Sequence, residues 1–160
     1  MAVDMFLKLG DIKGESTDDT HKDEIDVLAW SWGMSQSGTT HQGPGGGAGK
    51  VSVQDISVTK WVDKATPNLM LGCSTGQHYK DALLTIRKAG GTPVEYLKIT
   101  MKEVLISSVS TGGSQGEDRL TENVSLNFAE YKVSYTPQKE DGSEDAAIDA
   151  AYNMAKNVKV

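Results

Sequence analysis

The chain has 160 residues, of which 38% are hydrophobic and 24% charged, so one domain covering residues 1–160 with a packed core is expected. Its 16 basic and 22 acidic residues give a net charge of −6 without a basic run, which argues against binding to nucleic acid or to an anionic membrane. No stretch approaches about 18 uncharged apolar residues, so no membrane-spanning helix is expected.

Apolar residues that recur with period two predict strands along most of the chain. A first strand is predicted over residues 3–9, where Asp4 and Lys8 interrupt the apolar run in a way unlike a secretory signal. A polar loop is predicted over 10–22 and a second strand over about 23–36. In that strand large apolar residues (Leu28, Trp30, Trp32, Met34) alternate with small ones (Ala29, Ser31, Gly33, Ser35).

Residues 37–49 contain six of the 17 glycines and Pro44, a composition that predicts a long loop. The apolar positions that follow are Val51, Val53, Ile56 and Val58. Their alternation changes phase between Val53 and Ile56, which indicates a bulge or a strand that passes from one packing layer to another.

One helix is predicted over about 66–77. Thr66 and Pro67 have the character of an N-cap and first helical residue, and Gly76 that of a helix stop. Its inward-facing side chains are predicted to be Leu69, Met70 and Cys73.

Three further strands are predicted over about 82–88, 94–109 and 122–135, the first two joined by a hairpin turn at Gly90–Pro93. A second phase change lies near Ala129. These elements predict a mainly β fold, a closed or nearly closed β-barrel of two packed antiparallel sheets with one side helix.

The C-terminal segment combines two signals. The acidic and alanine-rich run after Ser143 favours a helix by propensity, whereas Tyr152, Met154, Val158 and Val160 alternate as in a strand. We expect a strand from about residue 152, after a short turn or helix.

The motifs of enzymes are incomplete. Residues 72–76 and 112–116 match G-x-S-x-G, but Ser74 ends the predicted helix and only His78 lies downstream, while Ser114 has no downstream histidine. The glycine-rich segment lacks both the Walker pattern and a helix that would bind pyrophosphate. The sequence therefore predicts no enzyme and no cofactor.

Metal and thiol chemistry are not predicted either. The histidines His21, His41 and His78 are scattered, without metal-ligand spacing. The single cysteine, Cys73, excludes an internal disulfide and is expected to be a small buried residue in a chain that folds in a reducing cytosol.

Several segments resemble the Hcp (haemolysin-coregulated protein) family. They are residues 8–16, 25–33, 49–60, 76–79, 84–88, 117–128 and 135–138, and together they span about 1–138. The resemblance is weaker at the C-terminus, because family members often have Gly-Trp before the last strand, where this chain has Ala151-Tyr152-Asn153.

The resemblance implies a secreted structural component of the bacterial type VI secretion system. Such proteins form homohexameric rings that stack into the inner tube, inside a contractile sheath and under a VgrG-like spike protein, and they carry effectors out of the cell. It implies assembly in the bacterial cytoplasm and then secretion to the extracellular space or a target cell without a signal peptide. A phage-type tail tube protein of a related contractile particle is the alternative.

Two sets of residues are candidates for function in such a tube. Small residues on one face of the second strand (Ala29, Ser31 and Gly33) are predicted to face the lumen, which would act as effector receptor or chaperone; a merely solvated face is the alternative. The glycine-rich segment is predicted to order against the neighbouring ring and set stacking. It comprises Gly38, Thr39, Thr40, His41, Gln42, Gly43, Pro44, Gly45, Gly46, Gly47, Ala48 and Gly49.

Overall fold

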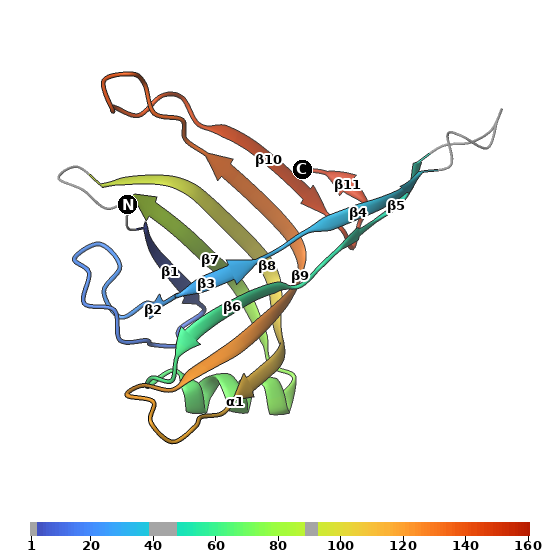
Figure 1. The fold of residues 1–160 in the computed structure, drawn as a ribbon. Helices are drawn as coiled ribbons and strands as arrows, with labels where there is room; N and C mark the ends of the chain where they lie inside the picture. The colour runs from blue at the N-terminus through green and yellow to red at the C-terminus, as the bar shows by residue number, and fades with distance from the viewer. Residues whose placement is uncertain (1–2, 39–47, 89–92) are drawn as a thin grey trace.

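The computed structural model of the chain describes residues 3–38, 48–88 and 93–160, which form a nine-stranded sheet, a two-stranded ribbon and one helix (Figure 1). The strands of the main sheet are β1 (Val3–Leu9), β2 (Ile25–Asp26), β3 (Ala29–Ser31), β6 (Ile56–Trp61), β7 (His78–Lys88), β8 (Val94–Thr111), β9 (Thr121–Tyr135), β10 (Ile148–Asn153) and β11 (Val158–Lys159). The ribbon consists of β4 (Met34–Gly38) and β5 (Ala48–Val53), and the helix is α1 (Thr66–Thr75). The predicted mainly β fold with one side helix is confirmed.

The main sheet curls because β9 has different neighbours along its length. Its first half pairs with β6 and its second half with β10, while β8 runs along its other edge. The borders of the curled sheet meet at residues 25–31, since β2 pairs with β1 and β3 pairs with β6. Between them, Val27 N–H donates to the Met5 carbonyl at 3.0 Å and Leu28 N–H to the Thr59 carbonyl at 2.8 Å.

Burial of alternate side chains inside this curl forms the core. Leu84, Ile106 and Leu126 on β7, β8 and β9 are among its fully buried members, and Leu69 of α1 seals one end. Burial of an aliphatic side chain of this size contributes about 1.5–3 kcal/mol, so the apolar residues of the period-two pattern stabilise the fold.

The structure confirms the predicted end of α1 but not its predicted start. Gly76 is confirmed as the stop, because its φ of 65° is left-handed and its N–H bonds back to the Cys73 carbonyl. The prediction for the start was wrong: Ala65 is the N-cap and Thr66 the first helical residue. The Thr66 hydroxyl instead donates to Glu122 Oε1 at 2.5 Å, inside a buried network.

The face of α1 was predicted in part. Leu69 is buried as predicted and Cys73 is half-buried against the core, but Met70 is 36% exposed. Gly72 lies on the buried face in its place, because a Cβ there would come within 2.2 Å of the Tyr79 hydroxyl oxygen.

The predicted second strand, 23–36, is wrong as one element, because it divides into β2, β3 and β4. After Ser31 the chain leaves the main sheet, and Trp32 Nε1–H donates to the Gln54 carbonyl at 2.9 Å. Of the four large apolar side chains of the predicted strand, Trp30 and Trp32 pack against the core, whereas Leu28 and Met34 are 39% and 44% exposed.

The predicted loop 37–49 was too long at both ends, since Gly38 pairs with Ala48 in the ribbon. Residues 39–47 lie outside the described residues. The predicted phase change between Val53 and Ile56 is confirmed, because β5 belongs to the ribbon and β6 to the main sheet.

The later strands start earlier or end later than predicted, as β7 begins at His78 and β8 ends at Thr111. The turn residues 90–92 lie outside the described residues. No helix forms over 143–151; the alanine-rich run instead pairs with β9, Ile148 opposite Tyr135, so the last strands begin before residue 152.

Candidate interaction surfaces

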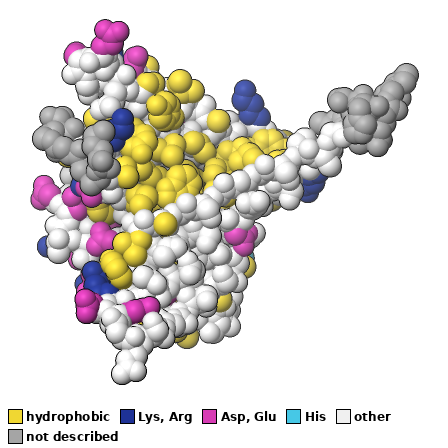
Figure 2. Space-filling view, viewed as in Figure 1, with side chains coloured by type: hydrophobic (Ala, Val, Ile, Leu, Met, Phe, Trp, Pro, Cys, Tyr) yellow, Lys and Arg dark blue, Asp and Glu magenta, His cyan; other side chains and the backbone are white. Residues whose placement is uncertain are grey.

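The core face of the sheet continues beyond the closed part of the curl as an apolar surface. It comprises Met34, Leu97, Tyr131, Val133, Tyr135 and Ile148, and Figure 2 shows it in yellow between β10 and the ribbon. Tyr135 is 46% and Ile148 67% exposed. A contiguous exposed patch of large apolar side chains is typical of a protein–protein contact.

A paired irregularity in β8 and β9 produces this apolar surface. Glu103 has a φ of 54° and, like Ala129 opposite, is missing from the ladder between the pairs Lys102–Glu130 and Val104–Phe128. The core-facing positions therefore change from even to odd numbers in β9, the phase change predicted near Ala129. Both strands keep apolar residues on one face, from the core to the apolar surface.

The opposite face of the same strands is polar. Lys102 Nζ lies 3.4 Å from Glu130 Oε2, and Lys132 Nζ lies 3.7 Å from Asp149 Oδ2. Exposed pairs of this kind add little stability. They do show that the two faces of these strands differ, one suited to water and the other to a protein partner.

The ribbon extends from the apolar surface away from the main sheet (Figure 1). Every residue of β4 is exposed. At its base, Tyr131 packs edge-on against Trp32 with ring centroids 5.1 Å apart, and its hydroxyl lies 3.9 Å from Met34 Sδ. Because an isolated two-stranded ribbon is marginally stable in water, its geometry favours contact with another chain.

The second candidate surface is a small-polar surface on the outer face of β3, β6, β9 and β8. Ala29 and Ser31 are exposed there and lie opposite Thr59 and Ser57. The register extends the row across the sheet to Asn123, Ser125 and Asn127 of β9 and to Ser108 and Ser110 of β8. All of these side chains are uncharged, and Figure 2 shows a broad white area below the apolar surface.

The structure brings two of the three predicted lumen residues together on one surface, which also contains residues of other strands. Ala29 and Ser31 share the small-polar surface, whereas Gly33 lies in the connection to β4, half-buried beside Gln54. The members on β6, β8 and β9 were missed. Their signal was the alternation of Asn123, Ser125 and Asn127, but only the strand register joins it to Ser31.

The serines of the enzyme-like motifs bond locally. Ser74 Oγ donates to the Met70 carbonyl at 2.8 Å and Ser114 Oγ donates to Glu117 Oε1 at 3.0 Å. Among residues 3–38, 48–88 and 93–160, no cluster of three or more His, Cys, Asp or Glu could hold a metal ion. In the same described part, no helix has the length and apolar character needed to span a bilayer.

A charged cluster that the sequence analysis missed covers the outer face of β1, β7 and β8. His21 lies between two carboxylates, with Nδ1 2.9 Å from Glu24 Oε2 and Nε2 2.5 Å from Glu95 Oε1. Arg87 donates to Asp18 Oδ1 at 2.6 Å and to Asp4 Oδ2 at 3.1 Å. The hydrogen bond from Arg87 holds the pKa of Asp18 well below its ordinary value, although burial opposes this.

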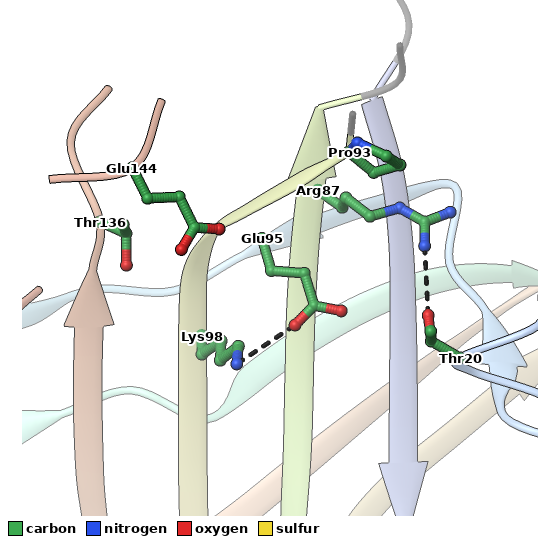
Figure 3. Close-up of a pocket in the computed structure, with 7 residues that line it drawn as sticks. All are labelled: Thr20, Arg87, Pro93, Glu95, Lys98, Thr136 and Glu144. Atoms are coloured by element: carbon green, nitrogen blue, oxygen red, sulfur yellow. Dashed lines mark hydrogen bonds and ion pairs between the residues drawn. The ribbon is translucent and has the colours of Figure 1, made fainter. Parts of the chain in front are cut away.

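Figure 3 shows the hollow of about 320 Å³ beside this cluster. Within its lining, Lys98 Nζ lies 3.2 Å from Glu95 Oε2, and Arg87 donates to the Thr20 hydroxyl at 3.4 Å. Burial raises the pKa of Glu95, but hydrogen bonds from His21 and Lys98 outweigh it, so the pKa is lowered. These contacts fasten the loop 10–24 to the sheet.

Comparison with known proteins agrees with this architecture. Residues 6–135 match the family described as "Type VI secretion system effector, Hcp". The protein hcp1 of Pseudomonas aeruginosa is 68% identical over 161 residues, which cover 99% of each chain. The crystal structure of Hcp1 from Salmonella typhimurium has 40% identity and a TM-score of 0.83 with full coverage of both chains. A solved type six secretion system protein has 31% identity and a TM-score of 0.93, with 99% of this chain and 100% of that chain covered. The family match over most of the chain and the full-length relative establish that this chain belongs to the Hcp family of the type VI secretion system.

Proposed function

We propose that the chain, as a single domain over residues 1–160, assembles into cyclic homohexamers. The rings would stack into the inner tube of the type VI secretion system, through which effectors leave the cell. Its membership of the Hcp family already makes it a secreted component of that system.

The observation that carries this proposal is the apolar surface at the open side of the curled sheet. Side chains such as Ile148 and Tyr135 remain in water in the single chain. A neighbouring copy that covers them removes this apolar area from water, and cyclic closure leaves no subunit with an uncovered surface. A cyclic hexamer meets this requirement, because each subunit covers one neighbour with one face and is covered by its other neighbour on a second face.

The small-polar surface suits the wall of the tube. Ser31 and the hydroxyl and amide side chains beside it can make weak hydrogen bonds, and together with Ala29 they are small enough to leave the bore open. We place Gly33 at the rim of this wall. Such a wall would hold effectors as a receptor or chaperone and still release them.

The segment from Gly38 to Gly49 would set ring stacking. Support comes from the ribbon, whose two strands carry the ends of this segment away from the main sheet (Figure 1). Contacts made by a glycine-rich segment are offset by the entropy lost when it orders, so ring–ring affinity would be weak. A tube of this kind can form on demand and come apart after delivery.

The remaining partners follow from the same function. Rings would assemble in the bacterial cytoplasm within a contractile sheath, under a VgrG-like spike protein, and would be secreted with their effectors. The chain itself would act without catalysis or cofactor, consistent with the local hydrogen bonds of Ser74 and Ser114.

Light scattering and negative-stain microscopy of the purified protein test the proposal. We expect rings of six subunits, and a monomer at micromolar concentration would refute it. Replacement of Gly43 to Ala48 by a two-residue turn should preserve the hexamer and abolish tube growth and secretion. Normal stacking and export of that variant would show that the segment only connects its two strands and does not set stacking.

A further inference from the structure

Asp55 lies where the chain passes from the ribbon to the main sheet, directly before β6. Its Oδ2 accepts a hydrogen bond from Ser107 Oγ at 2.6 Å and its Oδ1 accepts one from Asn127 Nδ2 at 2.9 Å. Ser107 occupies the irregular position of β8 between Ile106 and Ser108, and Asn127 belongs to the small-polar surface. The Asp55 carboxylate is therefore fixed over the edge of that surface.

The position matters because the small-polar surface has no charge of its own. Ala29 and Ser31 on β3, and the serine, threonine and asparagine side chains on β6, β8 and β9, are all neutral. The half-buried carboxylate of Asp55 at their border therefore adds a negative charge next to an otherwise uncharged surface. Since two donors already hold it, Asp55 can receive a cationic group with little further loss of side-chain freedom.

We propose that Asp55 determines which cargo the surface retains, and that it favours segments rich in lysine or arginine. This rests on the proposed function, in which the small-polar surface lines the bore of a ring. A cyclic hexamer would present six Asp55 carboxylates at one level of that bore. One exposed ion pair is weak, but a basic segment that meets several of them gains by multivalency.

The substitution Asp55→Asn separates this role from a purely structural one. Asparagine has the same shape, its amide oxygen can accept from Asn127, and its amide nitrogen can donate to Ser107 Oγ. Asp81→Asn is the matched control: it removes the same charge from an exposed position on β7, away from the small-polar surface. Asp55→Glu keeps the charge.

Binding of labelled oligolysine and oligoglutamate peptides of about ten residues to the purified hexamer measures the preference. We expect Asp55→Asn to weaken oligolysine binding about tenfold at low ionic strength and to flatten its salt dependence. Asp81→Asn should change it less than about twofold, within the range of a single exposed charge. Asp55→Glu should retain the wild-type preference, and oligoglutamate should bind poorly throughout.

Equal weakening by Asp55→Asn and Asp81→Asn would overturn the inference, because net charge alone would then explain binding. If Asp55→Asn fails to assemble, the variant Ser125→Lys provides the test instead. Its added cation on the small-polar surface should repel oligolysine, and unchanged oligolysine binding would refute the role of this surface. A wild-type protein that forms no rings would refute the proposed function itself, which is a separate result.

Discussion

Replacement of Lys60 by methionine tests the buried charge network beside the start of α1. Lys60 and Glu122 are directly opposite on β6 and β9, and both side chains are completely buried. Lys60 Nζ lies 2.6 Å from Glu122 Oε1 and 2.9 Å from Asp63 Oδ1, and it donates to the Trp61 carbonyl at 2.8 Å. One ammonium thus compensates two carboxylates out of contact with water.

Lys60→Met preserves most of the side-chain volume and removes the only cation in this network. The two carboxylates would then be left in the interior without a positive partner, a loss that costs about 3–5 kcal/mol for a broken buried pair. Because a whole domain is stable by only about 5–15 kcal/mol, the effect should be large. With an m-value of about 2 kcal/mol per molar urea, the midpoint should fall by about 2 M.

Urea unfolding followed by tryptophan fluorescence measures this loss, at one fixed protein concentration because association adds to apparent stability. The double variant with Lys60→Met and Glu122→Met should recover much of the loss, since apolar replacement of a buried ion pair is often neutral or stabilising. A loss below about 1 kcal/mol in Lys60→Met would refute the reasoning. The reasoning would also be refuted if the loss of stability in the double variant equalled the sum of the losses in the single variants Lys60→Met and Glu122→Met.

Three further outcomes are expected. Trp32→Ala should lower the free energy of unfolding by about 3 kcal/mol in the same urea experiment, because the indole packs against Tyr131 and the core; an unchanged midpoint would contradict this assignment. The Arg87 hydrogen bond lowers the pKa of Asp18 from 3.8, so the folded state binds fewer protons than the unfolded state in acid, and the stabilisation present above about pH 4 is lost as the pH falls. Asp18→Asn should therefore be more destabilising at neutral pH than near pH 2, and a pH-independent difference would argue against this linkage. Ile148→Asp should leave the fold intact, because the side chain is 67% exposed, while light scattering shows smaller species than the wild type; intact rings would place Ile148 outside the subunit contact.

Alternation of apolar residues predicted which face of a strand is buried, but not which strand lies beside it. β1 was predicted over its observed span, and β9 within one residue of it. The large side chains Trp30, Trp32 and Met34 also alternate, yet the pairing partner changes from β6 to β5 between them. A change of pairing partner leaves the period of two intact, so the alternation of side chains did not show where the predicted strand would break.

Contacts between positions far apart in the sequence could not be predicted either. The pairing of Lys60 with Glu122 depends on the register between β6 and β9, and the contact of His21 with Glu95 depends on how the loop 10–24 folds over the sheet. The same limit applied to the small-polar surface, of which only Ala29 and Ser31 were predicted. At the C-terminus, hydrogen bonding of β10 to β9 overrides the helix propensity of the alanine-rich run.

The attachment of residues 25–31 to both β1 and β6 has a consequence for the order of folding. Strands β7, β8 and β9 follow one another in the chain and pair as consecutive neighbours, so they can form a meander from local contacts. Residues 25–31 bond to both β1 and β6, which join the meander at opposite ends, through β7 and β9. Their docking should therefore be the slowest step, on the millisecond-to-second scale of non-local β pairing. In pulse-labelling hydrogen exchange, the amides of Val27 and Leu28 should be among the last to gain protection.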